Sequence, residues 1–212
     1  MTGVQTCALP ISYKAHKRIV FNGNNYSEEW VKEAEKRGLL NLRSTPEALD
    51  SFVAEKNVAL FSEFSVFSPV EMQSRYEILN EEYSKTIHIE AVTMLDMIAR
   101  QIIPATTFYA TSLAQAINQK KSAMPELKCE TEKALLSKVS TLTDELSEKH
   151  ADLEAVVEKS KAFGGSDLAH FTRESIVPAM EAARAVADSL ELLVGKNYWP
   201  FPTYGDILFY VN

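Results

Sequence analysis

The stretch FSPVEMQSRYEILNEEYSKTIHIEAVTMLDMIARQIIPA, residues 67–105, decides the fold of this chain. It opens with a helix start. The Ser68 side chain can accept a hydrogen bond from the backbone three residues later, and the Glu71 carboxylate can accept one in return. Pro69 suits the first helical position, where its missing N–H has no intrahelical partner to lose. These signals predict a long helix that begins at Pro69.

Apolar residues then recur in steps of three and four, which is the period of one helix face. A second apolar set lies beside this stripe, and we expect it to widen the buried face: Ile78, Ile89, Val92 and Leu95. A continuous stripe of this length predicts a central helix of the fold. The stripe itself consists of Met72, Tyr76, Leu79, Tyr83, Ile87, Ala91, Met94, Ile98 and Ile102.

Pro104 lies inside the same pattern. A proline here has no N–H to donate, and its ring clashes with the carbonyl of Arg100. We expect a kink rather than an end, with the helix continuing to about Lys121.

Two further long helices follow, separated by FGGSD at residues 163–167. The last one contains its own proline in Ile176–Ala179, a tetrapeptide similar to Ile102–Ala105. The likeness has two interpretations, adjacent kinks in neighbouring helices or an accident, and the sequence does not favour either. The stripe of the earlier helix has coiled-coil spacing and consists of Leu135, Val139, Leu142, Leu146, His150, Leu153 and Val157. That of the later helix consists of Leu168, Phe171, Ser175, Ala179, Ala183, Val186, Leu190 and Leu193.

These patterns predict an all-α fold: an antiparallel bundle of three long, partly proline-kinked helices over residues 67–197. Residues 13–66 are expected to form a connector of short helices. One begins after Ser27 and ends before Gly38, and another begins at Thr45 and runs to about Asn57. Residues 198–212, YWPFPTYGDILFYVN, form an aromatic tail. We expect it to pack on the bundle, with a contact between subunits as the second option.

Composition excludes several classes of function. The 212 residues carry a net charge of −7, which argues against a nucleic-acid-binding surface. No stretch reaches the roughly 20 apolar residues of a membrane span. Only two cysteines are present, Cys7 and Cys129, which fits the reducing cytosol, so we expect a cytoplasmic protein.

The sequence assigns no catalytic, cofactor-binding or metal-binding residue. His16, His88, His150 and His170 are far apart, and no pair has the spacing of a helical zinc site. His150 lies in a helix stripe, where a partly buried structural histidine is the simpler interpretation. Glu90 is the most interesting carboxylate, and we expect it to be buried and paired with a Lys or Arg across the bundle rather than catalytic.

Three long stretches together resemble the C-terminal part of type III glutamine synthetase: His16–Leu49, Ser74–Ala105 and Tyr198–Phe209. The resemblance extends from about Tyr13 to Asn212. It implies a parent enzyme that joins ammonia to glutamate with ATP and Mg or Mn, in a large homo-oligomer.

In that family the metal-binding and substrate-binding motifs precede the matching region, and none of them is present here. The resemblance therefore implies an inactive helical fragment whose partners are the catalytic domain and neighbouring subunits. The alternative is a free-standing helical interaction module without enzyme activity.

The first twelve residues, MTGVQTCALPIS, differ from everything after them because they carry no charge. They lack the basic start and apolar core of a signal peptide. They are similar to the translation of a common sequencing adapter. We therefore expect residues 1–12 to be artefactual and disordered, which would leave Cys129 as the one genuine cysteine.

Overall fold

The computed structural model describes residues 3–17, 20 and 22–209. The regular elements of this described part are all helices, with no strand, so the prediction of an all-α fold is confirmed. The chain divides into two compact units, residues 1–48 and 49–212, and each is described by itself.

The first unit contains α1 (Gly3–His16) and α2 (Glu28–Lys36). We expected disorder up to residue 12, whereas α1 is a helix that passes Ser12 without a break. The α2 helix follows Ser27, as predicted. It ends at Lys36, and Gly38 just beyond has a φ of +73°, the left-handed conformation that glycine adopts without strain. The N–H groups of Gly38 and Leu39 donate to Glu35 and Ala34, which satisfies carbonyls of the last turn.

The boundary between the units lies inside α3 (Thr45–Phe52), which is followed by α4 (Glu55–Glu63). The sequence predicted one helix to about Asn57, and this was wrong. Within the second unit, the Asn57 side chain donates to the Ser51 carbonyl at 2.6 Å, and the rings of Phe52 and Phe61 lie 6.0 Å apart. These contacts link α3 to α4 and hold the chain in two short helices.

The longest helical run comprises α5 (Pro69–Met97), a π-helical segment η2 (Ile98–Ile102) and α6 (Ile103–Ala123). The predicted capping box is present, because Glu71 N–H donates to Ser68 Oγ at 3.3 Å and Ser68 N–H donates to Glu71 at 2.8 Å. The helix continues through Pro104, as predicted. The π-helical segment η2, whose turns are wider than those of an α-helix, lies immediately before that proline.

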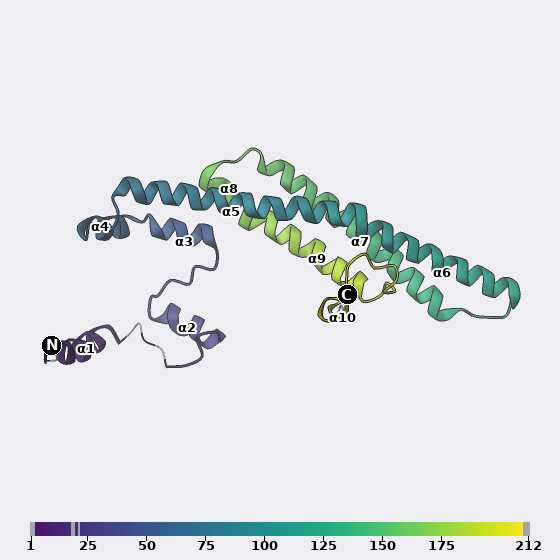
Figure 1. The fold of residues 1–212 in the computed structure, drawn as a ribbon, viewed down its shortest axis with the longest axis horizontal. Helices are drawn as coiled ribbons and strands as arrows, with labels where there is room; N and C mark the ends of the chain where they lie inside the picture. The colour runs from purple at the N-terminus through teal and green to yellow at the C-terminus, as the bar shows by residue number, and fades with distance from the viewer. Residues whose placement is uncertain (1–2, 18–19, 21, 210–212) are drawn as a thin grey trace. The chain divides into compact units, whose positions relative to one another are not determined.

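The bundle is completed by α7 (Glu130–Ser160), α8 (Gly165–Phe171), a second π-helical segment η3 (Thr172–Ile176) and α9 (Val177–Glu191). Figure 1 shows α7 returning beside α6, and α9 lying beside α7. The proline of each tetrapeptide, Pro104 in α6 and Pro178 in α9, follows a π-helical segment. Ile102 and Ile176 nevertheless belong to different core clusters, so the two tetrapeptides share local geometry rather than location.

Two clusters of buried side chains hold the three helices together, and the stripe of α7 supplies both. The first cluster consists of Ile98, Ile102, Val139, Leu146, Ala183, Val186, Ala187 and Leu190. The second consists of Ala91, Leu153, Val157 and Ile176.

Three apolar residues of α5 that were expected to be buried are exposed instead. Ile78, Ile89 and Val92 are 57%, 65% and 46% exposed, whereas we expected them to widen the buried face. The segments that pack against α5, chiefly α7 and α8, leave these three side chains uncovered. Leu95 alone of this set packs against a cluster.

The tail packs on the first cluster through Trp199 and Phe201. The Tyr198 ring contacts Tyr109 at 5.2 Å. The sequence did not predict the short helix α10 (Tyr204–Leu208), which follows a capping box formed by Thr203 and Asp206.

Candidate functional site

The four histidines are dispersed over the structure. His16 lies in α1, His88 is exposed on α5, and His150 is half-buried in α7, as expected of a structural histidine. His170 of α8 lies within hydrogen-bonding distance of the Asp50 carboxylate. Within the part of the chain that the structure describes, no group of three or more His, Cys, Asp or Glu side chains could hold a metal ion.

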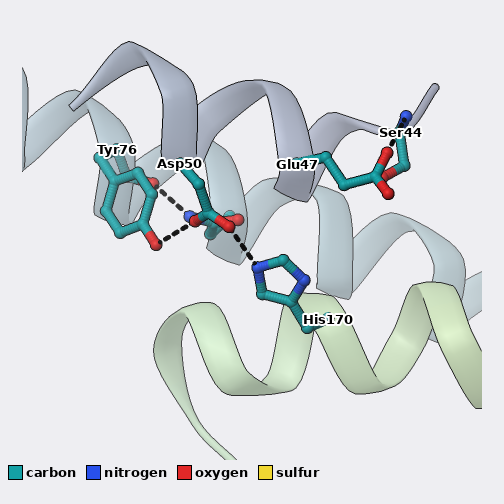
Figure 2. A network of polar contacts seen from close by, with 6 residues as sticks. Ser44, Glu47, Asp50, Tyr76 and His170 are labelled. Atoms are coloured by element: carbon teal, nitrogen blue, oxygen red, sulfur yellow. Dashed lines mark hydrogen bonds and ion pairs between the residues drawn. The ribbon is translucent and has the colours of Figure 1, made fainter. Parts of the chain in front are cut away.

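The contact of His170 belongs to a small polar network (Figure 2). Asp50 of α3 uses both carboxylate oxygens: one accepts from the Tyr76 hydroxyl of α5 at 2.8 Å, and the other lies 2.8 Å from Nε2 of His170 on α8. Burial is the largest cause that raises the pKa of Tyr76; a hydrogen bond with Ser166 opposes this rise, and the Asp50 carboxylate adds to it. The network ties three helices together at one end of the bundle.

Sequence analysis missed this network. The partners lie 26 and 120 residues from Asp50, so no local spacing connects them. The side chains of Asp50 and His170 are 48% and 33% exposed, and pairs of this kind stabilise proteins by about 1 kcal/mol or less. The arrangement is therefore a tether and not a buried reaction centre.

An apolar groove of about 520 Å³ lies in the second unit between α5 and α9, and we call it the α5–α9 groove. The tail forms one of its walls, because Trp199 and Phe201 line it with their rings 6.1 Å apart, edge to face. Methionine is prominent in the lining, and its flexible thioether adapts to irregular partners. The apolar lining residues are Ile89, Met94, Met97, Ile98, Ile102, Met180, Ala187, Trp199 and Phe201.

Acidic side chains border this groove on both walls. Glu90 lines it from α5, and Asp188 and Glu191 line it from α9. The one cationic lining residue, Arg184, lies 3.4 Å from the Asp188 carboxylate. Glu90 is exposed here, so the expectation of a buried, cross-bundle pair was wrong. Ala91 is buried on this turn of α5, so the side chain of the adjacent Glu90 points toward solvent.

No helix among the described residues is both long and apolar enough to cross a membrane. The α5–α9 groove is a separate feature, an exposed apolar surface of the bundle. A surface of this kind is typical of a contact site for another protein segment.

Known proteins align along almost the whole chain. Residues 8–121 match the family model described as the glutamine synthetase C-terminal domain, and this match begins inside the segment that we attribute to adapter sequence. The type-3 glutamine synthetase of Dictyostelium discoideum is 39% identical over 202 residues, covering 92% of this chain and 27% of that protein. The glutamine synthetase of Butyrivibrio fibrisolvens is 36% identical over 196 residues, covering 92% and 28%.

The glutamine synthetase of Bacteroides fragilis is 28% identical over 200 residues. This chain spans about a quarter of the length of these relatives, 27–28% of each. The family match covers more than half of the chain, and the helical bundle agrees with it. The chain therefore belongs to the glutamine synthetase C-terminal domain family.

Proposed function

We propose that this chain is the helical scaffold and oligomer-contact domain of a type III glutamine synthetase. The parent enzyme would join ammonia to glutamate with ATP and Mg or Mn, in the cytoplasm. The observation that carries this proposal is the alignment: 92% of the chain matches enzymes of that name, yet it spans only about a quarter of their length. The remaining three quarters of such an enzyme would be the part that this chain contacts.

The exposed apolar residues indicate where that partner binds. The α5–α9 groove and the adjoining outward face of α5, which carries Ile89 and Val92, leave apolar surface uncovered. Uncovered patches of this kind mark interaction sites in soluble proteins. We propose that the catalytic domain or a neighbouring subunit of the parent homo-oligomer covers them.

The chain alone is proposed to be inactive. Phosphoryl transfer needs positioned metal ions and cationic groups. The resemblance implies that the residues holding them lie in the part of the enzyme that this chain does not span. The test is a glutamine synthesis assay of the purified chain with ATP, Mg²⁺, glutamate and ammonia. Turnover above the blank would refute the proposal.

A chimera tests the contact role. This chain replaces the region that it matches in the Dictyostelium discoideum enzyme, and activity and assembled mass are measured. Ile89→Asp should reduce both in the chimera, because it places a charge in the docking surface. The same substitution should leave the melting temperature of the isolated chain unchanged within about 2 °C, because Ile89 is exposed.

Val66→Asp is the matched control. Val66 is also exposed, at 53%, but it does not line the groove. The control chimera should have the same activity and assembled mass as the unsubstituted chimera. Equal loss in both chimeras, or no loss in either, would contradict a specific contact at the groove.

The groove also supports a second candidate, a free-standing interaction module that shares only ancestry with the enzyme. The DNA upstream of codon 13 distinguishes the two. A reading frame that continues into a catalytic domain supports the scaffold, and a natural start site near Tyr13 supports the module.

A further inference from the structure

The two ends of the α5–α9 groove each carry an acidic side chain. Glu90 lines the groove from α5 beside Ala91, whose core cluster includes Met180 of α9. Glu191 lines it from the last position of α9. From Met180 to Glu191 the helix rises by about 16 Å, at roughly 1.5 Å per residue. The groove is therefore an apolar strip about three helical turns long, with a carboxylate near each end.

The negative charge at these ends is not balanced within the described part of the chain. Neither Glu90 nor Glu191 has an ion pair among the described residues. Glu191 also occupies an unfavourable place, because the C-terminal end of a helix carries about half a negative charge and α9 has no basic residue in its last turn. A cationic group brought to either end would therefore be attracted.

Between the charged ends the lining is apolar and adaptable. Three of the six methionines of the chain line the groove, Met94, Met97 and Met180. Their flexible thioether side chains can repack around an irregular apolar surface. Trp199 offers a large aromatic surface at one wall. Hydrophobic grooves rich in methionine that are bordered by acidic residues suit basic amphipathic helices.

The walls of the groove favour a helical partner over an extended one. The residues that the structure describes form no strand, so a partner segment has no sheet edge to which it can add its backbone. A partner in this apolar groove must satisfy its own backbone hydrogen bonds, and a helix does so internally. Its apolar side chains would recur at helical spacing along one face.

We propose that the α5–α9 groove binds a basic amphipathic helix from the part of the parent enzyme that this chain does not span. The apolar face of that helix packs on the three methionines and Trp199, and a Lys or Arg near each end of the face pairs with Glu90 and with Glu191. The source of the helix rests on the proposed function. The matched relatives extend well beyond this chain, which spans 27% and 28% of two of them, so they have ample sequence for such a helix.

The first experiment measures peptide binding to the full chain. Trp30→Phe leaves Trp199 as the single tryptophan, so its fluorescence reports on the groove. The probe is a capped helical peptide of about 14 residues, with leucines on one face, alanines elsewhere and a lysine at each end of the apolar face. We expect a saturable blue shift of the Trp199 emission, because the peptide removes water from the indole.

Two matched peptides test the chemistry of the partner. One has glutamate in place of each lysine, and the other has the same composition with the leucines scattered around the helix. Both should bind at least tenfold more weakly at low salt. The advantage of the lysine peptide over the glutamate peptide should shrink toward 1 M salt, where the screening length is about 3 Å. Equal binding of either matched peptide at low salt would overturn the proposal.

A double substitution tests the two carboxylates. Glu90→Gln with Glu191→Gln should weaken binding of the lysine peptide at least tenfold, and both side chains are exposed, so the fold should persist. Glu148→Gln with Glu154→Gln is the matched control, because it changes the net charge equally at exposed positions of α7 outside the groove. The control should bind normally. Equal weakening in both double variants would mean that net charge alone decides binding, which contradicts the assignment.

The chimera described above tests the source of the helix. Glu90→Lys with Glu191→Lys should lower its activity and assembled mass, whereas Glu148→Lys with Glu154→Lys should change neither. Loss with Ile89→Asp but not with the Glu90→Lys, Glu191→Lys variant would overturn this inference and leave the proposed function standing. No loss with either would contradict both. Self-association of the isolated chain that the same double variant abolishes would assign the groove to a second copy and also overturn the inference.

Discussion

Leu146→Ala is the sharpest test of the bundle, because Leu146 is fully buried in the first core cluster. That cluster joins η2, α7 and α9, so the substitution acts where three helices meet. It removes methyl groups without adding polarity or changing helix propensity unfavourably.

The expected cost is about 3–5 kcal/mol, the upper part of the range measured for buried Leu→Ala changes. The upper part applies because two of the cluster's other members, Ala183 and Ala187, have too little side chain to move into the void. Whole domains are stable by only about 5–15 kcal/mol. For a chain of this size the loss corresponds to a fall in melting temperature of roughly 6–20 °C.

Urea unfolding followed by far-UV circular dichroism measures this loss. The midpoint should fall while the slope of free energy against urea stays unchanged, since the folded surface is the same. Leu192→Ala is the matched control, because Leu192 is 87% exposed on the same bundle and should cost no more than about 0.5 kcal/mol. A loss below about 1 kcal/mol for Leu146→Ala, or equal losses in both variants, would refute the packing described here.

Three other outcomes are expected. Ser68→Ala should cost about 1 kcal/mol in urea unfolding, because it removes half of the capping box that starts α5, and Gln73→Ala on the exposed side of the same turn should cost less. Asp50→Asn should speed amide hydrogen exchange across α3 without changing exchange in α7, because the tether is local; faster exchange everywhere would contradict a local role. The Lys196 and then Thr203 hydrogen bonds lower the pKa of Asp206, so the stability they give α10 is full above the unfolded pKa of about 3.9 and declines as pH falls below it. Amide shifts of α10 should therefore begin to change only at pH values well below the ordinary aspartate range, and Asp206→Asn should abolish the change.

Local sequence signals predicted the helices well, for a physical reason. The Ser68–Glu71 box, the left-handed Gly38 and the α7 stripe through Leu146 all act within four residues of one another or repeat every turn. Interactions between residues so close along the chain can be recognised in a single sequence. The predictions failed at the break between α3 and α4, where contacts between side chains of adjacent short helices accompany the turn, and at the outward face of α5, where distant segments decide burial.

The same division holds for the candidate sites. No spacing in the sequence brings Asp50 to His170, or places Trp199 against the groove, because these contacts join segments far apart along the chain.

By itself the sequence determined that this chain is a helical bundle and which family it resembles, because periodicity, caps and long shared stretches are local properties. Tertiary structure alone decided which apolar residues are covered and which remain exposed. Burial depends on the neighbours that a helix acquires: the segments packed against α5 enclose Ala91, whereas Ile89, two residues away, stays exposed.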